Sequence, residues 1–379
     1  MLIQNKQMKL GYDDVSILPD VLSDISSRKE CNPYDENGML PIFASPMAAV
    51  VCEENIPDFL DNKINVVIPR TIYPTDQIAQ RIALGKKYDC FVAISLSEAQ
   101  QIIDDFTDPY GQRGWARRGE TYKICIDLAN GHMSRLLDIC SSLKKLEGVF
   151  FTIMTGNIAN PETYRAYENA GIDYVRVGIG GGSGCLTASN TGTYFPMFSL
   201  IEETAAVKQR ISGKCKIIAD GGIKGYRDIQ KALLFADYVM IGGLFNRAIE
   251  SAGKATYGNS YYNVNGKKIF RPFKTLFTYG REIKNRAKAF KLFKEDKLSI
   301  WKEFYGMSTK KAQTLVDPKA KTKTSEGKIF RQKVEYDLRG WVENETDYLR
   351  SAMSYTNSRT LKDFRESGYV LNNSIVYNK

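Results

Sequence analysis

Short apolar stretches alternate with amphipathic stretches over roughly the first 245 residues of the chain. The apolar stretches have the length of strands, and the stretches between them repeat apolar residues at helical spacing. The expected strands are Pro41–Met47, Ile64–Ile68, Phe91–Leu96, Tyr122–Leu128, Val149–Met154, Tyr174–Val177, Lys216–Ala219 and Tyr238–Ile241. The expected helices lie near 53–62, 74–84, 98–106, 133–146, 161–170, 198–211 and 226–234. About eight strands that alternate with helices favour a (β/α)8 barrel over an open, doubly wound sheet.

Small and acidic residues follow the expected strands directly. These segments are Ser45-Pro-Met47, Asp127-Leu-Ala-Asn-Gly131, Thr155-Gly-Asn157, Asp220-Gly-Gly222, Gly242-Gly243 and the loop that begins at Gly178. The active site of a (β/α)8 barrel lies at the C-terminal ends of its strands. A tight turn would explain any one of these segments, but their recurrence after so many strands indicates a functional site at one end of the barrel.

The loop that begins at Gly178 contains five glycines and one cysteine. Its sequence is Gly178-Ile-Gly-Gly-Gly-Ser-Gly-Cys-Leu-Thr187, which brings Ser183, Cys185 and Thr187 close together. Glycine lets backbone N–H groups approach an anion, so we expect a phosphate site beside the thiol. Cys185 is therefore the candidate nucleophile.

The other six cysteines form no CxxC pair and match no zinc pattern. They are Cys31, Cys52, Cys90, Cys125, Cys140 and Cys215, and in a reducing compartment we expect them to fill the core. His132 is the single histidine, so a Ser-His-Asp mechanism would have to rest on it. The sequence predicts no membrane span and no signal peptide, and we expect a cytoplasmic protein.

After residue 245 the alternation stops, and residues 254–302 contain about a dozen Lys and Arg with few acidic residues. Helical spacing of Ile283, Ala287 and Phe290 predicts a basic, largely helical insertion after the last-but-one strands. We expect it to pack on the barrel or on a neighbouring subunit. The net charge of +10 allows two interpretations, a nucleic-acid partner or the attraction of anionic nucleotides to a cleft, and the nucleic acid is the less favoured.

The rest of the chain completes what we expect to be a single barrel domain, residues 1–379. The motif Tyr305-Gly-Met307 precedes a lysine-rich stretch, about 309–328, that predicts a mobile loop or flap. A helix over 343–354 and a polar tail follow.

Five of these motifs resemble those of the IMP dehydrogenase/GMP reductase family and occur in the family's order. They are Gly178–Thr187, Asp220-Gly-Gly-Ile223, Gly242-Gly243, Tyr305-Gly-Met307 and Ser325-Glu-Gly327. The resemblance covers roughly residues 9–250 and 303–364. It implies a (β/α)8 barrel that forms a homotetramer and acts on C2 of a purine nucleotide through a covalent cysteine adduct.

The resemblance also implies a role for each motif. The catalytic group would be Cys185, Thr187 and Glu326. Nucleotide contacts would come from Ser183, Asp220, Gly221, Gly222, Gly242, Gly243, Tyr305, Gly306, Met307 and Ser308, with Asp220 on the ribose and Met307 at the base. Cofactor contacts would come from Asp127, Ala129, Asn130, Ser325 and Gly327. A K⁺ ion would bind the backbone of Gly180, Gly182 and Cys185.

Within the family, the sequence is most similar to GMP reductase. Dehydrogenases place an Arg-Tyr pair in the flap after the Tyr-Gly-Met motif, whereas no Arg or Tyr occurs between Met307 and Glu326. The spacing from Ile94 to Ile124 leaves no room for the regulatory CBS-type domain that most dehydrogenases carry. Ala188, Ala48 and Pro69-Arg70 depart from the family pattern and indicate a divergent member.

The implied reaction converts GMP to IMP and ammonia with NADPH as the hydride donor. Cys185 would attack C2, and the Thr187/Glu326 pair would relay protons as ammonia leaves. Three alternatives remain open at this stage. They are an IMP dehydrogenase, a reductase of a modified purine nucleotide, and a non-catalytic nucleotide-binding barrel.

Overall fold

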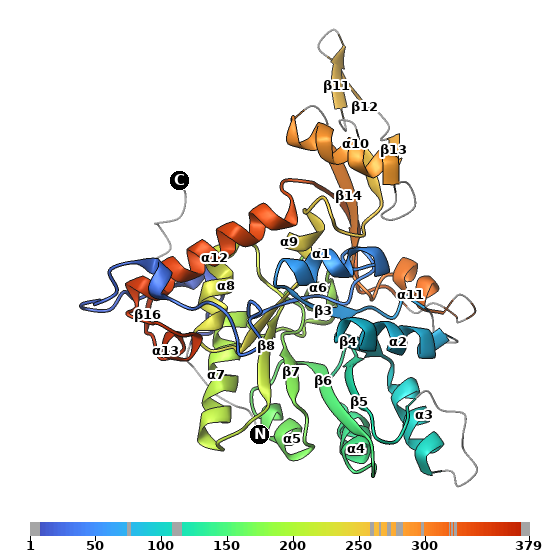
Figure 1. Cartoon of the computed structure of the whole chain (residues 1–379), viewed down its shortest axis with the longest axis vertical. Coiled ribbons are helices and arrows are strands. Elements are labelled where there is room, and N and C mark those ends of the chain that lie inside the picture. Colours follow the sequence, from blue (N-terminus) through green and yellow to red (C-terminus); the bar gives the residue numbers. More distant parts are fainter. Residues whose placement is uncertain are drawn as a thin grey trace.

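A closed barrel of eight parallel strands forms the centre of the molecule in the computed structural model (Figure 1). The structure describes residues 8–73, 77–107, 116–257, 261–264, 267–270, 274–277, 283–296, 299–317, 319, 321 and 324–372. The barrel strands are β2 (Ile42–Ala44), β3 (Asn65–Ile68), β4 (Phe91–Ile94), β5 (Thr121–Asp127), β6 (Phe150–Ile158), β7 (Tyr174–Val177), β8 (Lys216–Asp220) and β9 (Tyr238–Ile241). Each strand pairs with its sequence neighbours, and β2 pairs with β9 to close the ring. The predicted (β/α)8 barrel is confirmed.

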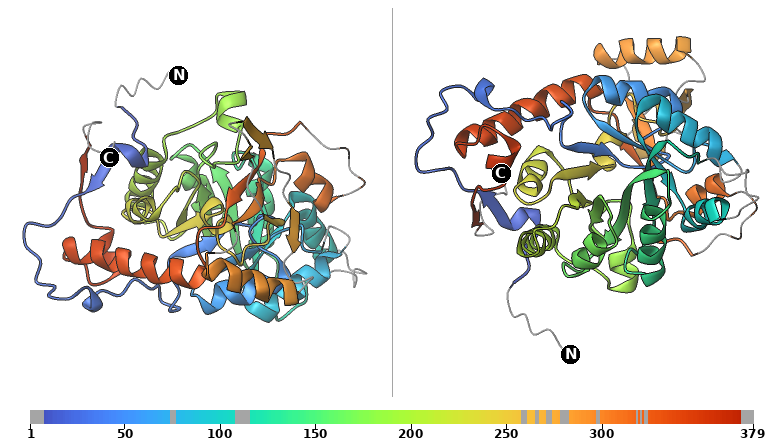
Figure 2. Two further views of the ribbon diagram at one scale, coloured as in Figure 1. Left: turned by 90° about the horizontal axis from the view of Figure 1, so that it is seen from above. Right: turned by 60° about the horizontal axis from the view of Figure 1, so that its bottom comes forward.

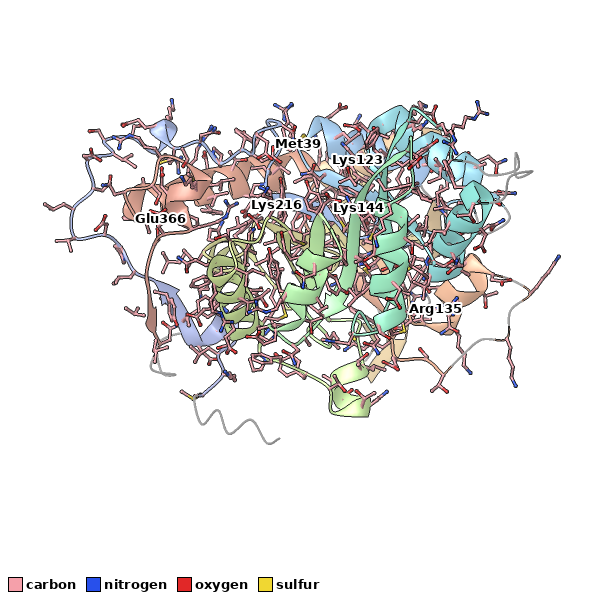
Figure 3. All side chains as sticks on the ribbon, turned by 90° about the horizontal axis from the view of Figure 1, so that it is seen from below. Met39, Lys123, Arg135, Lys144, Lys216 and Glu366 are labelled. Carbon is pink, nitrogen blue, oxygen red and sulfur yellow. The ribbon has the colours of Figure 1, made fainter. Side chains whose placement is uncertain are left out.

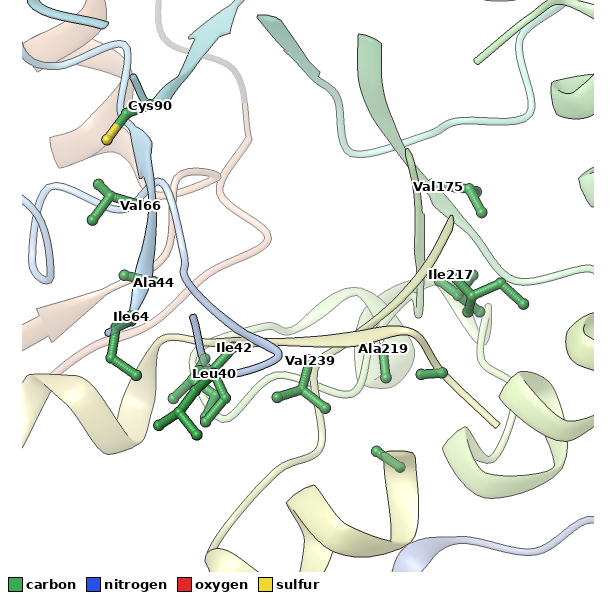
Figure 4. Packing of buried hydrophobic residues seen from close by; sticks show 14 of the residues in the cluster. Leu40, Ile42, Ala44, Ile64, Val66, Cys90, Val175, Ile217, Ala219 and Val239 are labelled. Carbon is green, nitrogen blue, oxygen red and sulfur yellow. The ribbon is translucent and has the colours of Figure 1, made fainter. Parts of the chain in front are cut away.

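Alternate residues of each barrel strand are buried on opposite faces, which explains why the strands are almost wholly apolar. Inward residues such as Phe43 and Tyr238 form a packed cluster inside the barrel, with ring centroids 5.2 Å apart. Outward residues such as Ile42, Val66 and Ile217 join a separate cluster beneath the helices (Figure 4). The barrel interior is therefore a filled core, and only its C-terminal end is available for a site.

Helices surround the barrel on its outer side (Figure 2). They include α1 (Ile56–Asp61), α2 (Ile78–Tyr88), α3 (Leu96–Thr107), α4 (Ser134–Lys144), α5 (Thr163–Asn169), α7 (Met197–Arg210) and α8 (Tyr226–Leu233). The first residues of the helix expected over 74–84 lie outside the described residues. Two C-terminal helices, α12 (Leu338–Tyr355) and α13 (Leu361–Phe364), and the strand pair β1 (Val15–Ile17) and β16 (Tyr369–Leu371) complete this layer. Trp341 of α12 stacks on Tyr226 of α8, which anchors α12 to the barrel.

Lys123, Lys144 and Lys216, which Figure 3 labels, lie near the N-terminal ends of the barrel strands. Lys144 forms an ion pair with Asp173 at 2.6 Å, and Lys123 forms one with Asp89 at 2.7 Å. Both pairs are at least partly exposed and contribute little to stability. These ion pairs lie at the ends of the strands opposite to the motif residues.

The basic insertion follows β9, the last barrel strand, and its described residues include more strand than helix. Its elements are β10 (Ala255–Tyr257), β11 (Tyr261–Val264), β12 (Lys267–Phe270), β13 (Lys274–Phe277), α10 (Ile283–Lys294) and the start of β14 (Ile300–Tyr305). The hairpin β11–β12 lies far from the barrel at the top of Figure 1. The predictions of a largely helical segment and of a position after the last-but-one strands are both wrong. The helical spacing holds only for α10, while β10 pairs with the first three residues of β14.

A four-stranded antiparallel sheet of order β13-β10-β14-β15 ties the insertion to the barrel mouth. Strand β14 ends at Tyr305, and β15 (Ile329–Lys333) begins two residues after Gly327, so both strands lead directly to predicted site residues. Helix α11 (Lys310–Val316) occupies the start of the segment expected to be a mobile loop, 309–328. Residues 318, 320, 322 and 323 of that segment lie outside the described residues, and its mobility stays a prediction. No helix in the described part of the chain is long and apolar enough to cross a bilayer.

A buried carboxyl group at the start of α12 predicts a pH-dependent stability. Glu250 accepts a hydrogen bond from Leu338 N at 2.9 Å, and burial raises the pKa of Glu250 from 4.5 to about 7. Because folding raises this pKa, the protonated Glu250 contributes its full share to the free energy of unfolding only below the pKa of the unfolded chain, 4.5. This contribution is lost as the pH rises through the folded pKa of about 7. We expect Glu250→Gln to gain about 2–4 kcal/mol of unfolding free energy relative to wild type between about pH 4.5 and pH 8. Urea unfolding of both proteins across this range measures the difference.

The exposed Glu335, which pairs with Arg247 at the surface, provides the control. Glu335→Gln should track the wild type within a few tenths of a kcal/mol at every pH. If the unfolding free energies of Glu250→Gln and wild type changed with pH in the same way, the pH dependence could not be assigned to Glu250.

Candidate active site

A cavity of about 460 Å³ opens at the C-terminal ends of the barrel strands. Most of the predicted site residues line it, drawn from segments that are far apart in the sequence. The predicted residues in its wall are Asp127, Ala129, Gly180, Gly182, Ser183, Cys185, Thr187, Asp220, Gly221, Gly222, Gly242, Gly243, Gly306, Met307, Ser308 and Glu326. Four others lie outside the wall: Asn130, Tyr305, Ser325 and Gly327. The functional roles of both groups stay predictions.

The thiol of Cys185 begins a short chain of hydrogen bonds. Its Sγ donates to Thr187 Oγ1 at 3.3 Å, and Thr187 Oγ1 donates to Glu326 Oε2 at 2.5 Å. All three side chains are partly buried and line the cavity. A thiol, a hydroxyl and a carboxylate in this order can pass a proton between the nucleophile and a leaving group.

Backbone pairing brings Glu326 to the cysteine loop across a long stretch of sequence. Cys185 and Gly327 form an isolated antiparallel bridge. Leu186 N donates to Glu326 O at 2.6 Å, and Lys328 N donates to Gly184 O at 3.0 Å. We name this contact, residues 184–186 against 326–328, the loop–flap pairing. This pairing fixes where the Glu326 carboxylate lies relative to the Cys185 thiol.

The cysteine loop requires glycine where it leaves β7. Gly178 has φ of 137°, and a Cβ added there would lie 2.2 Å from Asp220 O. A Cβ on Gly243 would lie 3.1 Å from Ser183 Oγ, so the loops after β7 and β9 nearly touch. Gly222 follows β8 between them. The three loops thus form a narrow backbone-lined pocket of the kind that suits a phosphate.

A mostly buried arginine, Arg176 of β7, joins two carboxylates in the wall of the cavity. Its Nη1 donates to Asp127 Oδ1 at 2.6 Å, and its Nε donates to Asp220 Oδ2 at 2.9 Å. Arg70 lies 3.8 Å from the other Asp127 oxygen and also lines the cavity. Burial alone would raise the pKa of Asp127, but the charges of Arg176 and Arg70 outweigh it and lower that pKa below its ordinary value. Asp127 is therefore ionised at neutral pH and can accept hydrogen bonds from a ligand.

Asn157 holds Asp220 from the other side. Its Nδ2 donates to Asp220 Oδ2 and to Gly178 O, each at 2.8 Å. Within the described residues, Asp220 Oδ1 accepts no hydrogen bond, so it is available to a ligand in the cavity. Two vicinal hydroxyl groups, such as those of a ribose, are suitable donors to such a carboxylate.

Sequence reasoning missed the roles of Arg176 and Arg70. Arg176 interrupts the apolar strand Tyr174–Val177, and a charge in a buried strand needs a charged partner. That signal could have identified Arg176, though not which carboxylates it pairs with. Arg70 was noted only as a departure from the family pattern.

His132 lies outside the cavity wall, and its ring is engaged elsewhere. Its Nε2 accepts from Ala159 N at 3.0 Å, and burial lowers the pKa of the imidazole. A Ser-His-Asp arrangement that rests on His132 is therefore not formed with the cavity residues. Of the other cysteines, five are buried and Cys52 is half-buried.

The residues expected to hold a K⁺ ion lie on one loop, but one carbonyl is already engaged. Gly182 O accepts from Cys185 N at 2.9 Å. A monovalent cation at this loop stays a prediction. For a nicotinamide cofactor, the cavity wall offers Asp127, Leu128, Ala129 and Glu326. This acceptor-rich and partly apolar surface suits a ribose and a nicotinamide ring.

Comparison with known proteins places the chain in a family. Residues 119–375 match the IMP dehydrogenase/GMP reductase domain. A protein named GMP reductase from Acidovorax sp. is 32% identical over 288 residues, which cover 69% of this chain and 84% of that protein. The GMP reductase of Oceanobacillus iheyensis is 30% identical over 295 residues, covering 76% and 84%.

A third relative aligns along almost the whole chain. The GMP reductase of Staphylococcus epidermidis is 26% identical over 384 aligned positions, which cover 97% of each protein. The match to the family domain spans more than half of the chain and includes the cysteine loop, the Tyr-Gly-Met motif and the Ser-Glu-Gly motif. The protein therefore belongs to the IMP dehydrogenase/GMP reductase family, and these three relatives are named GMP reductase.

Proposed function

We propose that the protein is a GMP reductase, which converts GMP to IMP and ammonia with NADPH. The observation that carries this proposal is the hydrogen-bonded series Cys185–Thr187–Glu326 in the wall of the barrel cavity. The sequence between Met307 and Glu326 contains no Arg or Tyr to activate water, which disfavours hydrolysis of the adduct. The relatives named GMP reductase point to the same activity.

The nucleotide would bind with its phosphate among the loops after β7, β8 and β9. Ser183, Gly222 and Gly243 converge there, and backbone N–H groups favour an anion. The ribose hydroxyls would donate to Asp220 Oδ1. The purine would then extend toward Met307 and place C2 near Cys185 Sγ, since both residues line the same cavity.

The reaction needs one nucleophile and one proton relay. The Cys185 thiolate would add to C2, the C2–N bond would break, and ammonia would leave after accepting a proton through Thr187 and Glu326. The product of this step is a thioimidate, a C2–S adduct on Cys185. The bound nicotinamide would supply the hydride that C2 receives. Cleavage of the C2–S bond then returns the electron pair to sulfur and releases IMP.

A direct assay distinguishes this activity from its alternatives. With GMP and NADPH, we expect the near-ultraviolet absorbance of reduced nicotinamide to fall as IMP and ammonia form in equal amounts. AMP, dGMP and XMP in place of GMP test the purine and the sugar, and IMP with NAD⁺ tests the dehydrogenase reaction. Reduction of NAD⁺ by IMP without NADPH oxidation by GMP would show that the protein is a dehydrogenase. Nucleotide binding without either reaction would indicate a non-catalytic barrel.

A further inference from the structure

Arg176 connects the two halves of the proposed site through one buried guanidinium. Its Nε and Nη2 contact Asp220 Oδ2 at 2.9 and 2.8 Å, while Nη1 donates to Asp127 Oδ1 at 2.6 Å. The arginine side chain is 8% exposed, so water does not separate the three groups. A planar guanidinium holds both carboxylates in a fixed relation, which a single ammonium group cannot reproduce.

Each carboxylate faces a different ligand if the proposed function holds. Asp220 Oδ1 remains available to the nucleotide ribose, and Asp127 lines the wall beside Leu128 and Ala129, where the cofactor is expected. We infer that Arg176 is a positioning residue that couples the nucleotide site to the cofactor site, so that each ligand orders the carboxylate used by the other. This inference rests on the proposed function and adds a regulatory property to that site.

The coupling follows from ordering costs. A ribose bound to Asp220 restrains that carboxylate, and the restraint passes through the guanidinium to Asp127 by direct hydrogen bonds. The second ligand then meets a carboxylate that is already positioned and loses less conformational entropy on binding. Because binding free energies are reciprocal, the cofactor must strengthen nucleotide binding by the same factor.

Further contacts hold the ends of this network in place. Asn157 fixes Asp220, and Arg70 approaches the second oxygen of Asp127. Arg81 is fully buried, donates to the backbone oxygens of Arg70 and Tyr73, and pairs with Glu98 at 2.6 Å. The loop that carries Arg70 is thus attached to the barrel wall, and Asp127 is linked to that wall through Arg70.

The test measures binding of a pair of ligands that cannot react. IMP lacks the C2 amino group, so IMP and NADPH should bind together without turnover. Isothermal titration gives the Kd of IMP with and without saturating NADPH, and their ratio is the coupling. We expect a ratio of about 10 in the wild type, within the usual range for coupled sites. In Arg176→Lys, we expect a ratio below about 2, with the Kd of IMP alone changed less than about threefold.

Arg365→Lys is the matched control, because Arg365 also makes several contacts but lies outside the cavity. Its Nε and Nη2 donate to Ala236 O and Asp237 O, both at 3.2 Å. This variant should keep the wild-type ratio. Asp127→Asn removes a charge from the other end of the bridge and should lower the ratio as Arg176→Lys does. If Arg176→Lys fails to fold, as judged by circular dichroism, Asp127→Asn decides the question.

The possible results separate the inference from the proposed function. A wild type that binds both ligands with a ratio of one would overturn the inference and leave the proposed function intact. The same holds if Arg176→Lys and Asp127→Asn both keep the wild-type ratio. A merely structural role would weaken both binary complexes and leave the ratio unchanged, which also counts against coupling. A folded wild type that binds neither IMP nor GMP would instead refute the proposed function.

Discussion

Replacing Cys185 with alanine is expected to lower turnover of GMP by at least about 10⁴-fold, because the covalent route to IMP needs its sulfur. The remaining chain of Thr187 and Glu326 offers a hydroxyl, but a hydroxyl held by a carboxylate 2.5 Å away is a poor substitute for a thiolate. Nucleotide binding should survive, since the phosphate and ribose contacts come from other loops. Single-turnover assays with a large enzyme excess measure the loss, and titration with IMP measures the binding.

Cys52→Ala is the matched control for Cys185→Ala. Cys52 is also half-buried, but it precedes α1 and lies outside the cavity wall. We expect this variant to retain activity within about twofold, as is usual for a substitution away from the reacting atoms. A Cys185→Ala enzyme that still reduces GMP at a tenth of the wild-type rate would refute a covalent mechanism.

Replacing Glu326 with glutamine is expected to lower kcat by about 10²–10⁴-fold, the usual contribution of a positioned acid or base. Glutamine can still accept the hydrogen bond from Thr187 Oγ1, so the geometry of the series is kept and only proton transfer is lost. KM for GMP should change little, because the proposed phosphate and ribose contacts come from other residues, such as Ser183 and Asp220. Initial rates over a range of GMP concentrations separate the two parameters.

Substitutions of Thr187 test the same relay from the middle. Thr187→Ser retains the hydroxyl between Cys185 Sγ and Glu326 Oε2 and should keep most of the activity. Thr187→Val has nearly the same shape without the hydroxyl and should lose activity as Glu326→Gln does. The double variant Thr187→Val/Glu326→Gln should be no slower than either single variant, because residues that act as a unit are not additive. Additive losses would contradict a shared relay.

The barrel was predictable from the sequence because its strands are short, buried on both faces and separated by amphipathic helices. Val175 and Val177 of β7, for example, face the helices and are fully buried, while Arg176 between them faces inward. Most strand ends followed from the same rhythm, and the glycines after them identified the mouth. Strand β6 is an exception, because it continues to Ile158 and contains Thr155-Gly-Asn157, which were expected to follow it. Local periodicity was sufficient because neighbouring strands in sequence are also neighbours in the barrel.

The pairings across the site were not predictable in the same way. The contact of Cys185 with Gly327 joins segments separated by a basic insertion and depends on how β14 and β15 pair. The bridge from Asp127 through Arg176 to Asp220 links three strands, and periodicity does not specify which buried charges meet. The sequence indicated the residues, and only the fold shows their partners.

The secondary structure of the insertion was predicted wrongly because the helical spacing found at residues 283–290 was applied to all of residues 254–302. The spacing of Ile283, Ala287 and Phe290 does correspond to a helix, α10. In the preceding part, the sequence Asn265-Gly266 stands between two stretches rich in aromatic and β-branched residues, which is typical of a hairpin. This hairpin pattern predicts the structure of residues 261–270 better than the positive charge of the insertion does.

Hydrogen exchange at two amides of the loop–flap pairing can report whether the site opens. The amide protons of Leu186 and Lys328 are held by hydrogen bonds that exist only while residues 184–186 and 326–328 stay paired. Their exchange with deuterium therefore records how often the two segments separate. If the carboxylate of Glu326 leaves the cavity when the flap opens, these two amides should exchange together and should slow together when nucleotide is bound. If products leave between these two segments, the frequency of that separation would set an upper limit on the rate of their release.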